Sequence, residues 1–189
     1  MEPLKKDISD DALMAGTARG EETAFRLLVL RWENDVIAFL AHMLGSREEA
    51  EDLAQDTFVQ VFRKSASYKG EGKFKSWLFR IAGNQARSKL RRRKILRWVS
   101  FDASVHDVAN REQGKIEEMV EDESARIVRE AVTTLPGRQR EALVLLRFQG
   151  LKYKEIAEVM GTTVPGVESL IQRAMENLRT KMTGKGLES

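Results

Sequence analysis

The chain of 189 residues contains no cysteine, which excludes a disulfide framework and a cysteine nucleophile. Its two histidines, His42 and His106, are far apart in the sequence, so a zinc finger is not expected either. No other cluster of nucleophilic or metal-ligating residues stands out in the sequence. We therefore predict no metal, no cofactor and no catalytic residues, and we expect that the protein is not an enzyme.

Long hydrophobic runs are also absent. Runs such as Leu27–Leu30 and Ala142–Leu146 are much shorter than the ~20 residues that cross a bilayer. The N-terminal segment MEPLKKDISDD lacks the apolar centre of a signal peptide. These features predict a cytoplasmic protein without membrane insertion. A hydrophobic content of 42% in a chain of this length suits one long helical domain or two small ones.

Charge is distributed unevenly along the chain, although the net charge is only +3. Residues 61–100 carry 13 basic side chains and one acidic one, whereas residues 1–60 carry 6 basic and 13 acidic ones. Residues 101–130 are acidic again, and residues 131–189 are weakly basic. A basic block between acidic segments is typical of a surface that faces a polyanion. A solvated basic helix is the alternative at this point.

Helical periodicity dominates the first part of the chain. Apolar residues from Phe25 to Met43 recur at the spacing of an amphipathic helix, which Gly45 would end. Ser46 and Glu49 have the spacing of a capping box at the start of a second helix. We expect the buried stripe of that helix to be Ala50, Leu53, Ala54, Phe58, Val61 and Phe62. The opposite face of this helix is polar, and it is either a docking surface or simply solvated. This face comprises Glu48, Asp52, Gln55, Asp56 and Gln60.

A basic helix is predicted after a polar loop at 65–73, where Gly70 and Gly72 break the helical pattern. Basic residues recur on one face of this helix with an amide side chain among them. No acidic residue occurs from 72 to 100, whereas a helix that is only solvated would normally interleave glutamate. This pattern favours contact with nucleic acid. The face comprises Lys73, Arg80, Asn84, Arg87, Arg91 and Lys94, and the buried side of the helix comprises Phe74, Trp77, Leu78 and Ile81.

The remainder of the chain divides into a linker and a second helical unit. Residues 101–123 hold 8 acidic and 2 basic residues without a sustained apolar stripe, which predicts the linker. Helices are expected from about residue 124, with a break at Leu135-Pro136-Gly137. The segment 151–182 has the layout of a helix-turn-helix, in which Gly161 permits the turn and Thr163 caps the second helix. A generic helical hairpin is the alternative.

Four motifs in this order resemble those of the extracytoplasmic-function (ECF, group 4) sigma factors of the sigma-70 family. They are AEDLAQDTFVQVF at 50–62, FKSWLFRIAGNQARSKLRRRK at 74–94, LPGRQREALVLL at 135–146 and the terminal helix-turn-helix. The resemblance implies an all-α protein with a sigma-2 domain at 1–98, an acidic linker at 99–123 and a sigma-4 domain at 124–189. It further implies an alternative sigma factor that binds core RNA polymerase and directs promoter recognition, promoter melting and transcription initiation.

The resemblance also suggests roles for residues of the sigma-2 domain. In the family, the acidic helix docks on the clamp helices of the polymerase β′ subunit, and the matching positions here are Asp52, Gln55 and Asp56. The loop and the basic helix would face the −10 element, where an unstacked base of the non-template strand is captured. An aromatic ring beside a cationic helix suits that task, because it stacks on a flipped base. The −10 residues are Tyr68, Lys73, Arg80, Asn84, Arg87 and Arg91, whereas Trp77 is expected in the core.

The sigma-4 domain would read the −35 duplex in the major groove and touch the flap of the polymerase β subunit. The positions that match the base-reading and phosphate-reading residues of the family are Glu168, Ser169, Gln172 and Arg173. The sequence departs from the commoner pattern, because Glu168 and Leu170 stand where many members carry basic residues. Glu168 would either accept a hydrogen bond from a cytosine N4 or orient Arg173.

The resemblance also implies binding partners, and one rival function has to be weighed against it. The resemblance implies promoter DNA, core polymerase and an anti-sigma factor as partners of a chain that is monomeric when free. The acidic linker would mimic RNA in the channel of the polymerase, or it is a plain tether. The rival function is a stand-alone helix-turn-helix regulator that binds duplex operators as a dimer. No segment for dimerisation or effector binding is left once the two units are assigned.

Overall fold

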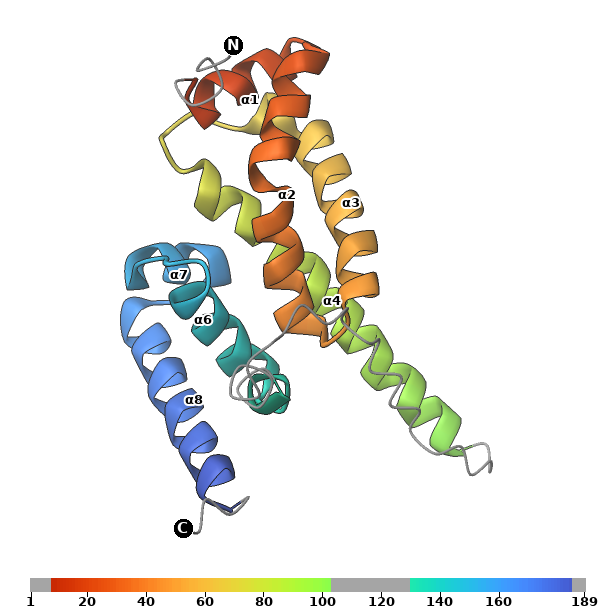
Figure 1. The fold of residues 1–189 in the computed structure, drawn as a ribbon, viewed down its shortest axis with the longest axis vertical. Coiled ribbons are helices and arrows are strands. Elements are labelled where there is room, and N and C mark those ends of the chain that lie inside the picture. The colour runs from red at the N-terminus through yellow and green to blue at the C-terminus, as the bar shows by residue number, and fades with distance from the viewer. Residues whose placement is uncertain (1–7, 103–129, 185–189) are drawn as a thin grey trace, which may run out of the picture.

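The computed structural model describes residues 8–102 and 130–184, and these are helical without a strand, as expected for an all-α fold. The first unit contains α1 (Asp10–Ala18), α2 (Glu22–Leu44), α3 (Arg47–Lys64) and α4 (Phe74–Asp102), with a short 3-10 turn, η1, at Ser65–Ser67. The second unit contains α6 (Gly137–Arg147), α7 (Tyr153–Met160) and α8 (Val164–Gly184). Figure 1 shows α4 extending well past the ends of α2 and α3.

The core of the first unit forms where α2 packs against α1, α3 and α4. Phe39 and Phe79 are fully buried and meet edge to face, with ring centroids 5.3 Å apart. Phe79 was not among the residues predicted to be buried. Trp32 reaches the same cluster, 6.4 Å from Phe79 between ring centroids. Burial of such rings supplies much of the hydrophobic free energy of a small helical domain.

The ends of α2 and α3 form largely as their sequences predict. Gly45 ends α2 with the left-handed backbone that favours glycine, at φ 76°. Ser46 caps α3, and its hydroxyl accepts a hydrogen bond of 3.3 Å from the backbone N–H of Glu49. The reciprocal half of the predicted capping box is wrong, because the Glu49 carboxylate instead forms salt bridges with Lys89 and Arg93 of α4. Two cations are stronger partners for a carboxylate than one backbone N–H.

The predicted buried stripe of α3 is wrong at its last residue. Phe62 is 48% exposed and makes an edge contact with Phe25, 5.2 Å between ring centroids. It lies about 100° around the helix from buried Val61, which places it at the edge of the seam with α2 and α4 and not inside it. Thr57 occupies that seam instead. Its hydroxyl donates to the carbonyl of Leu53 at 2.8 Å and lies 2.8 Å from the side-chain oxygen of Gln85.

The second unit is a compact helix-turn-helix supported by α6. Gly161 ends α7 at φ 59°, and the Thr163 hydroxyl accepts a hydrogen bond of 3.2 Å from the N–H of Gly166, as predicted for a cap. At the start of α7 the Glu155 carboxylate accepts from the N–H of Lys152 at 2.7 Å. Helix α8 packs on α6 and α7, and the buried Ile171 and Ala174 face that seam.

The two units lie against each other. Helix α6 packs on α2, and α7 packs on α4. Figure 1 shows α6 between α2 and α8, so that α8 is on the side of the second unit that faces away from the first. Helix α4 ends four residues beyond the predicted limit of the first domain, and the rest of the predicted linker lies outside the described residues. Residues 124–129, where the first helix of the second unit was expected to begin, also lie outside them.

Candidate nucleic-acid and polymerase interfaces

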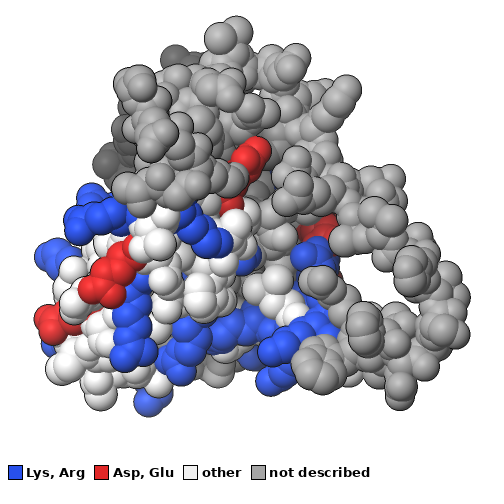
Figure 2. All heavy atoms as spheres, turned by 90° about the horizontal axis from the view of Figure 1, so that it is seen from below, with Lys and Arg blue, Asp and Glu red and all other residues white. Residues whose placement is uncertain are grey.

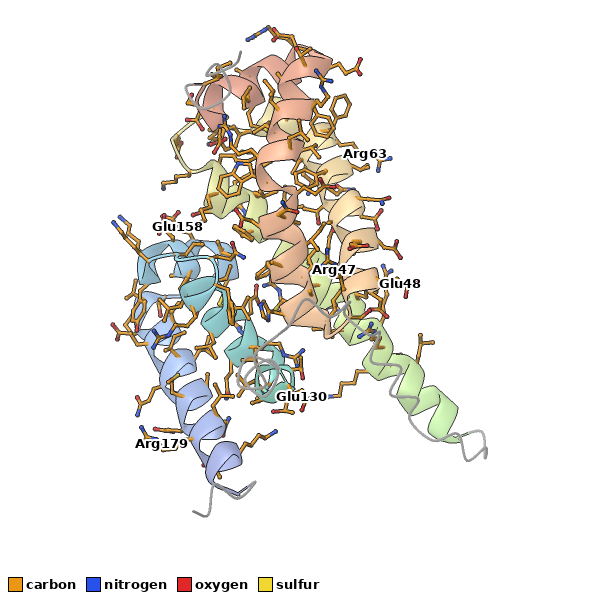
Figure 3. The ribbon with its side chains drawn as sticks, viewed as in Figure 1. Arg47, Glu48, Arg63, Glu130, Glu158 and Arg179 are labelled. Carbon is orange, nitrogen blue, oxygen red and sulfur yellow. The ribbon has the colours of Figure 1, made fainter. Side chains whose placement is uncertain are left out.

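The acidic face of α3 is open to solvent. Asp52, Gln55 and Asp56 are all exposed, and none of them forms an ion pair or hydrogen bond within the described part of the chain. Figure 3 labels Glu48 near the N-terminal end of the helix and Arg63 near its C-terminal end. Acidic residues in the first turn and basic residues in the last turn complement the helix dipole. The predicted docking residues are therefore free to meet a partner.

The loop before α4 is fastened to α1 by one carboxylate. The Tyr68 hydroxyl donates to Asp11 Oδ1 at 2.5 Å, and the N–H of Gly72 donates to Asp11 Oδ2 at 2.7 Å. Burial, followed by the bond to Asp11, raises the pKa of the Tyr68 phenol well above its ordinary value. The ring is half-buried against Phe74 and Trp77, at centroid distances of 5.9 and 5.2 Å. No pattern in the sequence indicated that Asp11, 57 residues earlier, would hold this loop.

The basic face of α4 forms on one side of the helix as predicted, but its members differ in accessibility. Arg80, Asn84 and Arg91 are exposed. Arg87 is half-buried and donates to the Asn84 side chain and to the carboxylate of Glu141 on α6. Lys73 lies 3.3 Å from Glu158 on α7, the residue labelled at the top of the second unit in Figure 3. The structure thus brings two of the predicted −10 residues together with acids of the other domain.

Glu141 is the most buried charged side chain of this contact, at 0% exposure. Burial raises the pKa of its carboxyl, and Arg87 and Arg138 act in the opposite direction. One feature of the sequence indicated that Glu141 is buried, because an apolar run that continues to Leu146 follows it directly. A second signal was Gly83, a glycine in the interior of a helix without a turn or cap to explain it.

Basic side chains also extend over other parts of the surface. Figure 2 shows more lysine and arginine than aspartate and glutamate on the described part of the face seen from below. Toward the end of α4, Arg93 pairs with Glu49, and burial lowers the pKa of its guanidinium. Arg91 and Lys94 remain exposed there. Around residues 91–94, α4 therefore presents a cationic surface that can lie along a nucleic-acid backbone.

The outer face of α8 carries the predicted −35 residues. Glu168, Gln172 and Arg173 are exposed, and Ser169 is half-buried. The Gln172 amide donates to Glu176 at 3.0 Å. Within the described residues Arg173 has no ion-pair partner, so Glu168 does not orient it in this conformation. A helix that presents polar and cationic side chains in this way has the geometry of a recognition helix for the major groove.

No helix of residues 8–102 or 130–184 has the length and hydropathy needed to cross a bilayer. The same segments contain no group of three or more candidate metal ligands.

A helix-turn-helix joined to a cationic helical unit defines a two-domain DNA-binding protein. The model for sigma-70 region 2 matches residues 28–95, and the model for sigma-70 region 4 matches residues 125–178. The chain is 34% identical over 186 residues to the ECF RNA polymerase sigma-E factor of Haemophilus influenzae, covering 95% of this chain and 98% of the relative. It is 32% identical over 178 residues to the RNA polymerase sigma-H factor of Pseudomonas aeruginosa, covering 88% and 90%. The chain belongs to the ECF sigma factors of the sigma-70 family, and it is an alternative sigma factor that directs transcription initiation.

Solved structures support the same fold. CnrH, solved in complex with the cytosolic domain of CnrY, has a TM-score of 0.69 at 27% identity and covers 94% of this chain and 99% of its own. The sigma factor RpoE of Bartonella quintana, in complex with the anti-sigma factor NepR, also has a TM-score of 0.69, at 24% identity. It covers 87% of this chain and 98% of its own, and it supports the fold alone.

Proposed function

We propose that this sigma factor binds core RNA polymerase through the exposed face of α3 and has no catalytic activity of its own. Asp52 and Asp56 carry the charge of this surface, and Gln55 lies between them in the sequence. Three polar side chains that have no partner among residues 8–102 and 130–184 suit a partner helix with basic residues better than they suit the interior of this fold. The partner would be the clamp helices of the β′ subunit, as the family resemblance implies.

The −10 element would be bound by the loop at 65–73 and the basic face of α4. Arg80, Arg87 and Arg91 neutralise phosphates, and Asn84 offers an amide that pairs with a base edge. Tyr68 would stack on an unpaired base, which requires its ring to leave part of its present contact with Trp77. Lys73 marks the point at which the loop joins the helix.

The −35 element would be read as duplex DNA by α8. Gln172 and Arg173 lie on the exposed face of this helix, where they can reach base edges or phosphates in the major groove. Glu168 would accept a hydrogen bond from the exocyclic amine of a cytosine, and Ser169 would contact the backbone. The sigma-4 domain would also touch the flap of the polymerase β subunit.

A protein that holds the sigma factor inactive is a further proposed partner. The related CnrH was solved with the cytosolic domain of CnrY, at 27% identity to this chain. We infer an anti-sigma factor as a partner here, as the family resemblance implies, on a sigma factor that is monomeric when free. The chain would act in the cytoplasm, because promoter DNA and core polymerase are there. The domain limits 1–98, 99–123 and 124–189 stay a prediction.

The experiment that tests the function combines purified chain, core polymerase and a library of promoter fragments. We expect transcription from a subset of fragments that share −35 and −10 sequences, and only when core polymerase is present. The rival regulator function predicts the opposite result, specific duplex binding without polymerase and no transcription with it. The observation that favours the sigma factor is that relatives of this class cover both units of the chain, including the α3 and α4 surfaces.

A further inference from the structure

The exposed face of α8 carries two carboxylates with an amide between them. Glu168, Gln172 and Glu176 are all exposed and stand four residues apart. Each step of four residues advances one turn and rotates by about 40°, so the three side chains follow one another along a line on the helix surface. A negative charge therefore lies one turn before and one turn after Gln172.

One of these carboxylates holds the amide of Gln172. The side-chain nitrogen Nε2 donates to Glu176 Oε1 at 3.0 Å. Because a carboxylate only accepts hydrogen bonds, the nitrogen of the amide has to face Glu176 and the oxygen has to face away from it. The contact with Glu176 thus distinguishes the two ends of an amide that could otherwise point either way.

The rest of the amide group is available to a ligand. The bond to Glu176 uses one of the two amide hydrogens. Within residues 8–102 and 130–184, the Gln172 side chain makes no other hydrogen bond. One N–H donor and one carbonyl acceptor remain, side by side in the plane of the amide. A ligand that presents an acceptor next to a donor would satisfy both groups at once.

Adenine is the base that presents this pattern in the major groove. Its N7 accepts and its N6 amine donates, and a glutamine amide can bond to both atoms together. Guanine presents two acceptors there, thymine presents one acceptor beside a methyl group, and cytosine presents a single donor. Adenine is therefore the base that engages both groups left on Gln172.

The flanking charges favour the same choice. Glu168 and Glu176 repel phosphates, so this line of α8 is suited to base edges and not to the DNA backbone. They also repel the N7 and O6 acceptors of guanine, whereas an exocyclic amine is attracted to a carboxylate. Arg173 lies about 100° around the helix from Gln172, at the side of the line, where a cation can approach a phosphate.

We propose that Gln172 reads an adenine of the −35 element and that Glu176 is the positioning residue that orients its amide. This inference rests on the proposed −35 role of α8. Glu176 touches no base and acts only through Gln172. By restricting the amide before DNA binds, Glu176 reduces the side-chain entropy that is lost on binding.

The first experiment measures the preference for each base. The full chain, assembled with core polymerase, is mixed with promoter fragments randomised at the −35 element, and the bound fragments are sequenced. The parent should prefer adenine at one position by roughly 5- to 150-fold, the range for a bidentate amide contact. Gln172→Ala should lose that preference and keep those at the other positions. A preference for another base at the position that depends on Gln172 would overturn the inference.

The role of Glu176 is tested with two uncharged replacements that serve as controls for each other. Glu176→Gln retains an oxygen that can accept from Gln172, whereas Glu176→Leu does not. Both variants lose one negative charge, so both should bind all fragments more tightly by a similar factor.

The adenine preference should separate these two variants. It should stay close to that of the parent in Glu176→Gln and fall about twofold in Glu176→Leu, because a side-chain bond across one helical turn is worth about that factor. An undiminished preference in Glu176→Leu would overturn the positioning role. Equal losses in the two variants would also overturn it, since they would assign the effect to charge.

Base analogues identify the atoms that Gln172 contacts. Fragments carry 7-deazaadenine, which lacks the N7 acceptor, or purine, which lacks the N6 amine, at the position found above. Each analogue should weaken binding of the parent by roughly 2- to 10-fold, the usual worth of one hydrogen bond. Gln172→Ala should be insensitive to 7-deazaadenine and less sensitive than the parent to purine. Unchanged binding of the parent to the 7-deazaadenine fragment would refute the bidentate contact.

Failure of the proposed −35 role gives a different result. A parent holoenzyme that shows no preference at any −35 position would refute −35 recognition by α8. If the parent shows preferences and Gln172→Ala leaves every one of them unchanged, −35 recognition stands and the inference about Gln172 is wrong. Thermal unfolding of each variant should match the parent, because Gln172 and Glu176 are exposed.

Discussion

The carboxylate of Asp11 accepts a hydrogen bond of 2.5 Å from the hydroxyl of Tyr68 and a second bond of 2.7 Å from the N–H of Gly72. One side chain of α1 therefore holds two points of the loop that leads into α4. The positive φ of Gly70 and Gly72, at 62° and 68°, allows the chain to turn back toward α1 between these points. The shape of the proposed −10 loop thus depends on a helix that contributes none of the proposed DNA contacts.

Replacing Asp11 by alanine should destabilise the protein by about 1–3 kcal/mol, because the Tyr68 hydroxyl and the Gly72 N–H lose a charged acceptor. Tyr68→Phe removes only one of the two bonds and should cost less. Chemical denaturation followed by circular dichroism measures both. Glu71→Ala is the control within the same loop, since Glu71 is exposed. Equal stability of Asp11→Ala and Glu71→Ala would contradict the role of Asp11.

The Tyr68 phenol should lose its proton at a higher pH in the folded protein than in the unfolded chain. Burial and Asp11 raise its pKa, so the associated stability is fully present below the pKa of an unfolded tyrosine, about 10, and is lost as the pH rises through the higher folded value. Tyrosinate absorbance measures this directly, because the chain has only two tyrosines. The delayed component should disappear in Tyr68→Phe and on unfolding. A Tyr68 that titrates alike in folded and unfolded chain would contradict the bond to Asp11.

The double replacement Asp52→Ala and Asp56→Ala should weaken binding to core polymerase severalfold without a loss of thermal stability. Both carboxylates are exposed and have no partner within the described residues, so the fold does not depend on them. Affinity is measured by titration of labelled sigma factor with core enzyme. Glu33→Ala, an exposed acid on α2, is the control for a general effect of charge. Unchanged core affinity in the double variant would argue against docking through α3.

Arg173→Ala should reduce −35 recognition by roughly 1–3 kcal/mol if the guanidinium contacts a base. The loss would then be confined to promoters with the preferred base at that position. Lys154→Ala, an exposed cation on α7, is the control and should have a smaller effect. Initiation on a set of single-base promoter variants is the measurement. A loss that is uniform across sequences would identify Arg173 as a phosphate contact and remove it from base recognition.

Sequence patterns predicted the local structure because they report on neighbours within a few turns of helix. The spacing of apolar residues gave α2, α3 and α4, and Gly45 and Gly161 ended their helices as expected. The periodicity predicted wrongly that Phe62 is buried. Its neighbour Val61 faces the seam, and a shift of one position around the helix is enough to make a side chain exposed. The capping-box bond predicted for the Glu49 side chain is also absent, because Arg93, distant in the sequence, pairs with its carboxylate.

The all-α class, the two units, the basic face of α4 and the family of the chain could all be predicted from the amino-acid sequence. These follow from helical periodicity, from charge blocks and from motifs that are each continuous in the sequence. The pairing of Arg87 with Glu141, 54 residues away, and of Tyr68 with Asp11, 57 residues away, became visible only in the folded chain. Pairs of this kind depend on how whole helices pack, and no local spacing encodes which surfaces will meet.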